Sequence, residues 1–322
     1  MLKFILRRTL LMIPQLFFLS ILVFMLAKAM PGDALTGVLD SNPNASAEHI
    51  EKVREKMGLN DPWYQQYGRW VGNAIQGDFG KSYVHQQKVT NILADKVENT
   101  IILSFFTLIV TYIIAIPLGI IAGRWTDSWA DKMIVTYNYF AFATPLFVFA
   151  LLMMFMFSFV LDWFPYGGSV DIKLDAGTWD YIVSRAKHLV LPVMSGALLL
   201  TFSTIQYLRN DIIDQKMKDY VKTARAKGVP EGKVYTRHIL RNSLLPIAAF
   251  LGIEITGLIG GSVFIESIFS YPGLGYLFIQ SIGTRDFPVV TILIMISGAA
   301  VIVGTMLSDI ILSIVDPRIR IE

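Results

Sequence analysis

The sequence predicts an all-α membrane protein whose helices cross a lipid bilayer several times. Of the 322 residues, 54% are hydrophobic and only 16% are charged, and the mean hydropathy is +0.53. These values lie outside the usual range of soluble domains. The apolar residues also form long unbroken blocks, whereas helices that cover a soluble core show periodic apolar stripes. The bulk of the chain is therefore expected to lie within lipid.

Six blocks are long enough to cross about 30 Å of hydrocarbon at 1.5 Å per residue. Five of them contain no Asp, Glu, Lys or Arg: 9–27, 100–123, 133–161, 188–208 and 287–308. The sixth, 242–265, contains one acid, Glu254. We therefore expect six transmembrane helices.

The first block also follows basic residues and ends near Ala27-Lys28-Ala29, a pattern typical of a signal-peptidase site. Its apolar run exceeds the roughly 7 to 15 residues of a signal-peptide core. We therefore expect a retained first span.

The distribution of Lys and Arg predicts the orientation, because basic residues in short segments beside the spans favour the cytoplasmic side. With the N-terminus inside, the inner segments hold 16 Lys and Arg and the short outer loops hold 4. Both termini are therefore expected in the cytoplasm, with the chain spanning the plasma membrane several times. The expected parts are the N-terminus with the first span (1–29), an extracytoplasmic cap (30–99), a five-span core (100–313) that includes a cytoplasmic loop (209–243), and a cytoplasmic tail (314–322).

The cap region is rich in amphipathic aromatic residues of the kind that rest at lipid headgroups: Trp63, Tyr64, Tyr67, Trp70 and Phe79. This composition favours a small cap lying against the membrane over a separate ligand-binding domain.

Several kinds of chemistry find no support in the sequence. There is no cysteine, and the four histidines are scattered without metal-ligand spacing. The run from Gly77 to Ser82 superficially resembles a phosphate-binding loop, but Ile75 stands where that loop needs glycine. We therefore expect no catalytic residue, no metal and no cofactor on this chain; if ATP drives the protein, another chain binds it.

The loop 209–243 is too long for a simple connection and too well patterned for a disordered tail. A first helix is expected over 211–227, ended by Gly228 with Pro230 close behind, and a second over 231–241. The nine cationic side chains of the loop would suffice for contact with anionic lipid. However, the small residues in the run 223–228 permit close approach of another protein surface, and Gly228 permits a sharp turn.

These residues resemble a known family. The run Asp219-Tyr220-Val221-Lys222-Thr223-Ala224-Arg225-Ala226-Lys227-Gly228, followed by Arg237-His238, Arg241-Asn242 and Leu245-Pro246, is similar to the coupling motif of binding-protein-dependent ABC importer permeases. Its form resembles the oligopeptide and dipeptide branch, which also includes nickel and opine importers. The resemblance extends through Met30-Pro31-Gly32-Asp33, Gly77-Asp78-Phe79-Gly80-Lys81-Ser82, Pro272-Gly273-Leu274-Gly275 and Asp316-Pro317-Arg318.

The resemblance implies a permease of the type I importer fold in the plasma membrane of a bacterial cell, with a cytoplasmic coupling helix-turn-helix. It implies the following partners: a homologous second permease, two ABC ATPase subunits that bind ATP and Mg, an extracellular peptide-binding protein, a peptide substrate and the lipid bilayer, with no nucleic acid. The residues that it implies for ATPase coupling are Asp219, Tyr220, Thr223, Ala224, Arg225, Ala226, Lys227 and Gly228. The expected function is ATP-driven import of oligopeptides; dipeptides, opines or chelated nickel are alternative cargoes, and an ATP-independent channel or secondary transporter is an alternative class.

Two acids are candidates for the translocation path. A carboxylate within hydrocarbon is costly and generally faces a cavity or a partner, so we expect Glu254 to face the interior of the bundle. It could contact the substrate or shape the path, or it could be protonated or hydrogen-bonded to a neighbour. Glu266 lies near the outer end of the same block, where it could instead be an interfacial charge.

Overall fold

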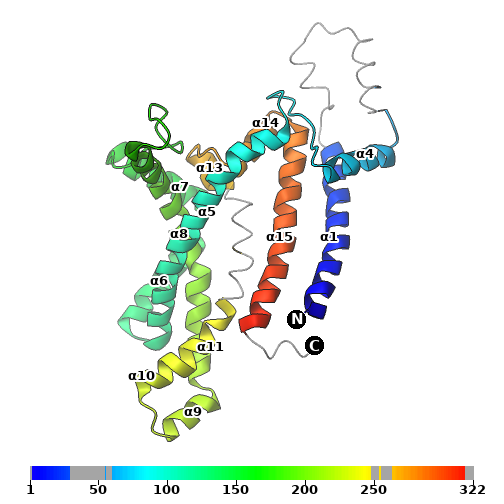
Figure 1. Cartoon of the computed structure of the whole chain (residues 1–322). Helices are drawn as coiled ribbons and strands as arrows, with labels where there is room; N and C mark the ends of the chain where they lie inside the picture. The colour runs from blue at the N-terminus through cyan, green and yellow to red at the C-terminus, as the bar shows by residue number, and fades with distance from the viewer. Residues whose placement is uncertain (1, 30–54, 56–59, 248–253, 255–262, 316–322) are drawn as a thin grey trace.

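The computed structural model describes residues 2–29, 55, 60–247, 254 and 263–315, and these residues are almost entirely helical (Figure 1). Within that part of the chain, β structure is limited to an isolated bridge between Lys81 and Lys88. The helices, in chain order, are α1 (Leu2–Ala29), α4 (Trp63–Ile75), α5 (Val89–Arg124), α6 (Trp129–Ala143), α7 (Leu146–Met154), η1 (Phe155–Val160), α8 (Trp179–Lys216), α9 (Asp219–Ala226), α10 (Glu231–Lys233), η2 (Val234–Leu240), α11 (Arg241–Ser243), α13 (Val263–Ile268), α14 (Leu274–Gly283) and α15 (Phe287–Val315).

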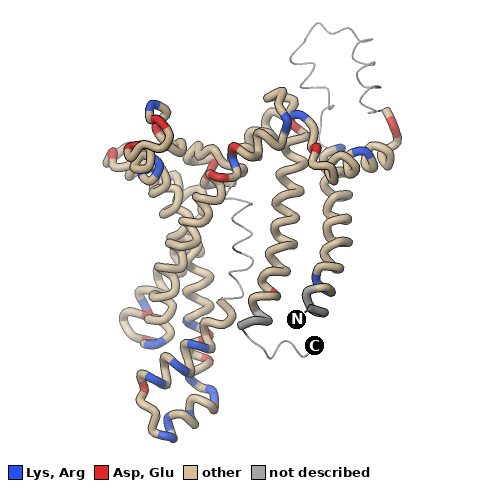
Figure 2. The backbone as a smooth tube through the Cα atoms, in the orientation of Figure 1, with Lys and Arg blue, Asp and Glu red and all other residues tan. Residues whose placement is uncertain are grey.

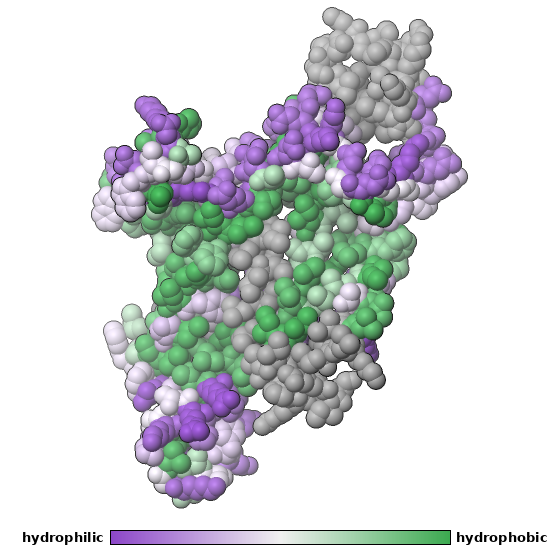
Figure 3. Space-filling model, in the orientation of Figure 1, coloured by the Kyte–Doolittle hydropathy of each residue, from purple (hydrophilic) through white to green (hydrophobic). Residues whose placement is uncertain are grey.

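Four of these helices are long and apolar enough to cross a membrane: α1, α5, α8 and α15. They contain four of the six expected spans. Their apolar surfaces form a broad belt between two polar ends of the molecule (Figure 3). Most of the expected span 242–265 lies outside the described residues.

The expected span 133–161 is not one straight helix. It is divided into α6 and the continuous pair α7–η1, which meet at an angle of 100°. The break falls at Thr144 and Pro145, both with extended backbone. Proline has no N–H to donate and disfavours helical backbone in the residue before it. The local chemistry of Pro145 therefore interrupts a block whose hydropathy alone suggests one continuous span.

Helices α5 and α8 pack along each other at glycine residues. A Cβ atom at Gly119 would lie 3.0 Å from Cβ of Leu208, and one at Gly123 would lie 2.8 Å from Cβ of Ile212. Glycine therefore allows the two backbones to approach more closely than any larger residue would, as small residues do between membrane helices.

Helices α1 and α15 form a second pair (Figure 1). Arg8 near the start of α1 and Asp309 near the end of α15 form an ion pair of 2.9 Å. A Cβ atom at Gly298 of α15 would lie only 2.7 Å from Leu19 of α1. The start of the first helix and the end of the last therefore lie at the same end of the molecule.

Helix α4 of the expected cap packs beside the far end of α1. The hydroxyl groups of Tyr67 and Ser20 lie 2.7 Å apart, and Phe24 contacts the rings of Tyr67 and Trp70. Trp63 remains half exposed. The aromatic residues of α4 thus pack on α1 on one side and stay partly exposed on the other.

Glu266 on α13 is fully buried and holds the start of α14. Its Oε2 atom accepts hydrogen bonds from the backbone N–H groups of Gly275 (2.7 Å) and Tyr276 (3.0 Å). Its Oε1 atom accepts one from the Thr100 hydroxyl of α5 (2.9 Å). A carboxylate at a helix N-terminus satisfies donors that have no partner within the helix. Glu266 therefore joins α13, α14 and α5.

Replacing Glu266 with alanine should destabilise the protein, because three buried donors would lose their acceptor. We expect a cost of roughly 2–4 kcal/mol, measured as a lower apparent Tm of the purified protein in mild detergent. Glu266→Gln keeps one acceptor oxygen and should cost less. Glu98→Ala, which removes an exposed carboxylate paired with Arg185, serves as the control and should leave the Tm unchanged. Equal losses for Glu266→Ala and Glu98→Ala would contradict this role.

Candidate coupling site

The candidate coupling site is the segment from Met217 to Ser243, which projects from the end of α8 (Figure 1). The sequence predicts one helix over 211–227, and this prediction is wrong in one respect. Helix α8 ends at Lys216, Lys218 is extended, and the separate helix α9 begins at Asp219. The second predicted helix, 231–241, is present as the continuous helical run formed by α10, η2 and α11.

The break before α9 allows that helix to fold back on the rest of the segment. Val221 and Ala224 of α9 are buried in one apolar cluster with Val234 and Ile239 of η2. The cluster continues to Ile212 of α8 and the apolar residues beside it. Burial of this face offsets the helical hydrogen bonds lost at the break, an example of tertiary packing that overrides local helix propensity.

The opposite face of α9 is exposed and carries most of the residues expected to couple to an ATPase. Asp219, Thr223, Arg225, Ala226 and Lys227 are exposed. Tyr220 is 38% exposed, and its hydroxyl donates a hydrogen bond of 2.6 Å to Gln215. Ala224 differs from the others because it faces the chain's own core. The eight predicted residues thus lie on α9 and the turn after it, with Ala224 packed against the core of the segment and the other seven at the surface.

A sharp turn follows α9. Gly228 has a φ of +73°, in the left-handed region that favours glycine, and Pro230 precedes α10. The turn is spanned by Arg225, whose guanidinium donates two hydrogen bonds to Glu231, of 2.6 and 3.0 Å. These hydrogen bonds hold the pKa of the Glu231 carboxyl below its usual range. The exposed Lys222 has the same effect on the pKa of Asp219, through a hydrogen bond of 2.9 Å.

The base of the segment is attached to the end of α5. The Lys216 ammonium donates to the backbone carbonyls of Gly123 (2.5 Å) and Arg124 (2.8 Å). The Arg124 guanidinium in turn lies 4.8 Å from the ring centroid of Tyr235, in cation–π geometry. A cation at the end of a helix also complements its dipole.

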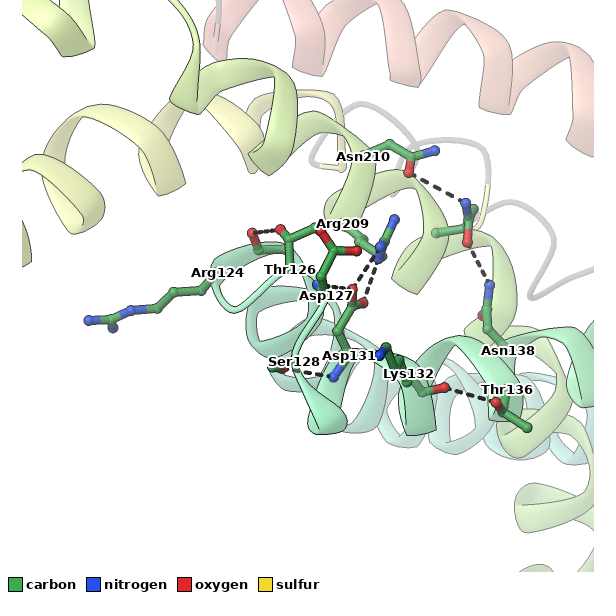
Figure 4. A network of polar contacts seen from close by, with 12 residues as sticks. Arg124, Thr126, Asp127, Ser128, Asp131, Lys132, Thr136, Asn138, Arg209 and Asn210 are labelled. Carbon is green, nitrogen blue, oxygen red and sulfur yellow. Dashed lines mark hydrogen bonds and ion pairs between the residues drawn. The ribbon is translucent and has the colours of Figure 1, made fainter.

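A buried ion pair ties the α5–α6 connection to α8 (Figure 4). Arg209 donates two hydrogen bonds to Asp131, of 2.6 and 2.8 Å, and Asp131 is 2% exposed. Asp131 also accepts from the backbone N–H of Asp127, at 2.8 Å. Such a two-pronged arginine–carboxylate pair has a fixed geometry. Neither residue could be assigned to a site from the sequence, because the two positions are 78 residues apart and meet only in the folded chain.

Lys and Arg gather on this end of the molecule, over α9, α10 and the ends of α5 and α8 (Figure 2). The site therefore presents a mixed basic and small-residue surface on a rigidly attached base.

The two acids expected on the path have different surroundings. Glu254 is partly buried and forms a hydrogen bond with the Tyr112 side chain of α5; its Oε2 atom has no partner among the described residues. Glu266 is buried in the capping arrangement described above. The described part of the chain contains no cluster of three or more side chains that could hold a metal ion.

Replacing Gly228 with alanine should strain the turn, because an L-residue in the left-handed region costs roughly 1–2 kcal/mol. A Cβ atom there would meet no other atom within 4 Å, so any effect comes from the backbone alone. We expect trypsin to cleave the folded protein beside Arg225 and Lys227 about 5 to 30 times faster.

Gly232→Ala is the matched control. It introduces the same methyl group into open space on α10, where the backbone is helical, and should leave the cleavage rate unchanged or lower it. Identical rates for the two variants would show that the turn is not held by Gly228.

Comparisons with known proteins agree with this architecture over nearly the whole chain. Residues 115–321 match the family described as binding-protein-dependent transport system inner membrane component, and residues 1–104 match the N-terminal region of such membrane components. The chain is 40% identical over 321 residues to the oligopeptide transport system permease protein AppB of Bacillus subtilis (strain 168), covering 99% of this chain and 100% of that protein. It is 33% identical over 320 residues to the glutathione transport system permease protein GsiC of Escherichia coli (strain K12), covering 99% of each.

Among solved structures, the chain resembles the MetNI methionine ABC transporter in an inward-facing conformation. The TM-score is 0.52 at 14% identity, over 70% of this chain and 97% of that chain. This likeness supports the expected type I importer fold, and the family matches confirm the resemblance seen in the sequence. The chain belongs to the inner membrane components of binding-protein-dependent transport systems, as a permease subunit of ABC importers of the oligopeptide and glutathione type.

Proposed function

We propose that this chain and a homologous second permease together form the path by which oligopeptides, delivered by an extracellular binding protein, enter the cell. The observation that carries the proposal is the exposed face of α9 on its rigid base, in a chain 40% identical to an oligopeptide permease. ATP is hydrolysed on two separate ATPase subunits, and α9 inserts into a groove on one of them. The basic end of the molecule faces the cytoplasm, in agreement with the distribution of Lys and Arg.

The arrangement of the segment supports a mechanical role. Tyr235 of the segment contacts Arg124 at the end of α5, and α8, from which the segment projects, is tied to α5 by Lys216 and to α6 by Arg209. Movement of α9 with an ATPase subunit would therefore move these helices together as one body. A rigid-body change between two states, biased by ATP on another subunit, then alternates access between the two sides of the membrane.

Glutathione is a second candidate cargo, favoured by the 33% identity to the glutathione permease. Like an oligopeptide, it offers amide N–H and carbonyl groups. Uptake of a radiolabelled pentapeptide with and without excess glutathione distinguishes the two. If other peptides inhibit uptake of the labelled pentapeptide and glutathione does not, oligopeptides are the favoured cargo.

The first test is purification of the chain from its native membrane in mild detergent, with mass spectrometry of what accompanies it. We expect a second permease and two ATPase subunits in stoichiometric amounts, and binding-protein-dependent peptide uptake after reconstitution. Recovery of this chain alone, under conditions that keep a known importer intact, would refute the proposal and favour a self-sufficient channel or carrier.

A bulky side chain on the exposed face of α9 should weaken docking. Ala226→Phe adds volume where a small residue permits close approach, and overpacking costs typically 1–3 kcal/mol. We expect peptide-stimulated ATP hydrolysis to fall about tenfold or more, with less ATPase recovered alongside the permease. Ala176→Phe, in an exposed turn at the opposite end of the molecule, makes the same change and should leave both unchanged. Normal ATPase association and hydrolysis in Ala226→Phe would place docking elsewhere.

A further inference from the structure

A groove between α6 and α8 contains polar side chains within the apolar part of the molecule. Its volume is about 450 Å³, within the roughly 300–1,000 Å³ typical of ligand pockets. Eight side chains line it, and none of them is Asp, Glu, Lys or Arg. Asn138 on α6 lies two helical turns, about 10 Å, from Asp131. The groove therefore begins above the ion pair at the base of the coupling site and extends into the span.

Three carboxamides form a row along the groove. Asn138 donates to Gln206 (3.0 Å), and Gln206 donates to Asn210 (3.4 Å). Asn138 and Asn210 stand on facing helices (Figure 4). Ser203 also lines the groove and is exposed. The row thus offers donors and acceptors along one side of an open channel.

One end of the row has no partner. Asn138 is 6% exposed. Its Nδ2 atom donates to Gln206, whereas its Oδ1 atom has no hydrogen-bond partner among the described residues. A buried polar atom left without a partner costs about 1–3 kcal/mol. The Oδ1 atom is shielded in this conformation, so a ligand in the groove supplies the missing hydrogen bond once the Asn138 side chain rotates toward it.

Aromatic rings form the rest of the lining. Phe142 of α6 and Phe202 of α8 lie with ring centroids 5.3 Å apart, and Tyr139 beside them is 70% exposed. The groove thus combines apolar contact area with a few polar groups, as small-ligand sites do.

The polar and aromatic side chains of the groove indicate which kind of molecule covers it: lipid, a helix of a second permease or a peptide. Gln206 and Asn210 are exposed and use only part of their hydrogen-bonding capacity within the row, so lipid would leave their remaining donors and acceptors without partners, at a cost. A transmembrane helix of a second permease has its own backbone groups satisfied internally, so it could serve these carboxamides only where it carries a polar side chain. An extended peptide, by contrast, carries a free N–H and C=O at each residue. Because no charged side chain lines the groove, the recognition would be of main chain rather than of particular side chains.

We infer that this groove is a binding site for the main chain of the transported peptide, with Asn138, Ser203, Gln206 and Asn210 as its polar contacts. The inference rests on the proposed function and adds the residues of the path. On this inference the path takes its polar contacts from the groove and not from Glu266, which is buried and accepts a hydrogen bond from the start of α14.

The absence of cysteine from this chain makes a direct test possible. Ser203→Cys places one thiol in the groove, and Lys132→Cys places one on the exposed end of α6, outside the groove lining. Each variant is reconstituted as the complete transporter with its binding protein and ATP, and the rate of maleimide labelling of this chain is measured with and without alanine pentapeptide. We expect the peptide to slow labelling of Ser203→Cys at least threefold and to leave Lys132→Cys unchanged.

A second measurement removes the unpartnered amide. Asn138→Leu is nearly isosteric and should lower the initial rate of pentapeptide uptake about three- to tenfold, as expected for the loss of one or two hydrogen bonds. Thr136→Val is the matched control on the same helix, because among the described residues the Thr136 hydroxyl bonds only to the carbonyl of Lys132. Uptake by this variant should be unchanged. Recovery of the partner subunits with both variants verifies assembly.

The outcomes separate this inference from the proposed function. If the unaltered transporter imports the pentapeptide but the peptide does not protect Ser203→Cys, the groove is not on the path. If labelling is equally slow with and without peptide, and a short bis-maleimide links the thiol to a second permease, the groove is an interface between subunits and the inference is overturned. If the unaltered transporter imports no peptide at all, the proposed cargo itself is wrong.

Discussion

The close packing of α5 against α8 is the constraint on which the rest of the described structure depends. Between membrane helices there is little hydrophobic driving force, so association relies on close contact and on polar groups. Here Gly119 and Gly123 provide the contact, because each leaves room for a branched side chain of α8. The two long helices are thereby held in one register along their length. That register fixes which residues meet at their common end, where Lys216 reaches the last carbonyls of α5.

The polar contacts at this end convert the helix pair into a base for the coupling segment. Asp131 and Arg209 attach the connection between α5 and α6, and Arg124 lies over the ring of Tyr235. The apolar cluster beneath α9 completes the attachment, since Val221 and Ala224 pack on the same residues that close α8. These contacts hold α9 against α8 and η2 in addition to its two chain connections. If an ATPase subunit docks on α9 as proposed, they transmit its movement to the helices.

The acids and amides of the spans illustrate how similar residue types serve different purposes. Glu266 has every oxygen engaged by neighbouring donors and so stabilises the junction of α13, α14 and α5. The amide of Asn138 is equally buried, yet one of its atoms has no partner in the described part of the chain. Satisfied polar groups rigidify a core, whereas unsatisfied ones mark places where another molecule completes the hydrogen bonds. Hydropathy cannot separate these cases, because both are single polar residues in apolar blocks.

Properties that depend on short stretches of sequence could be read without the structure. The membrane class, four long helical spans, the turn at Gly228 and the second helix of the coupling segment follow from apolar length and from glycine and proline chemistry, and the motif around Ala224 identified the family. Properties that depend on contacts between distant residues could not. The break between α8 and α9 is stabilised by apolar burial against η2, and the role of Glu266 depends on donors from α14 and α5. The amide row requires Asn138 to face Gln206 from another helix, 68 positions away. Side chains in a bilayer find their partners across helices, and only the packing of those helices decides which partners they meet.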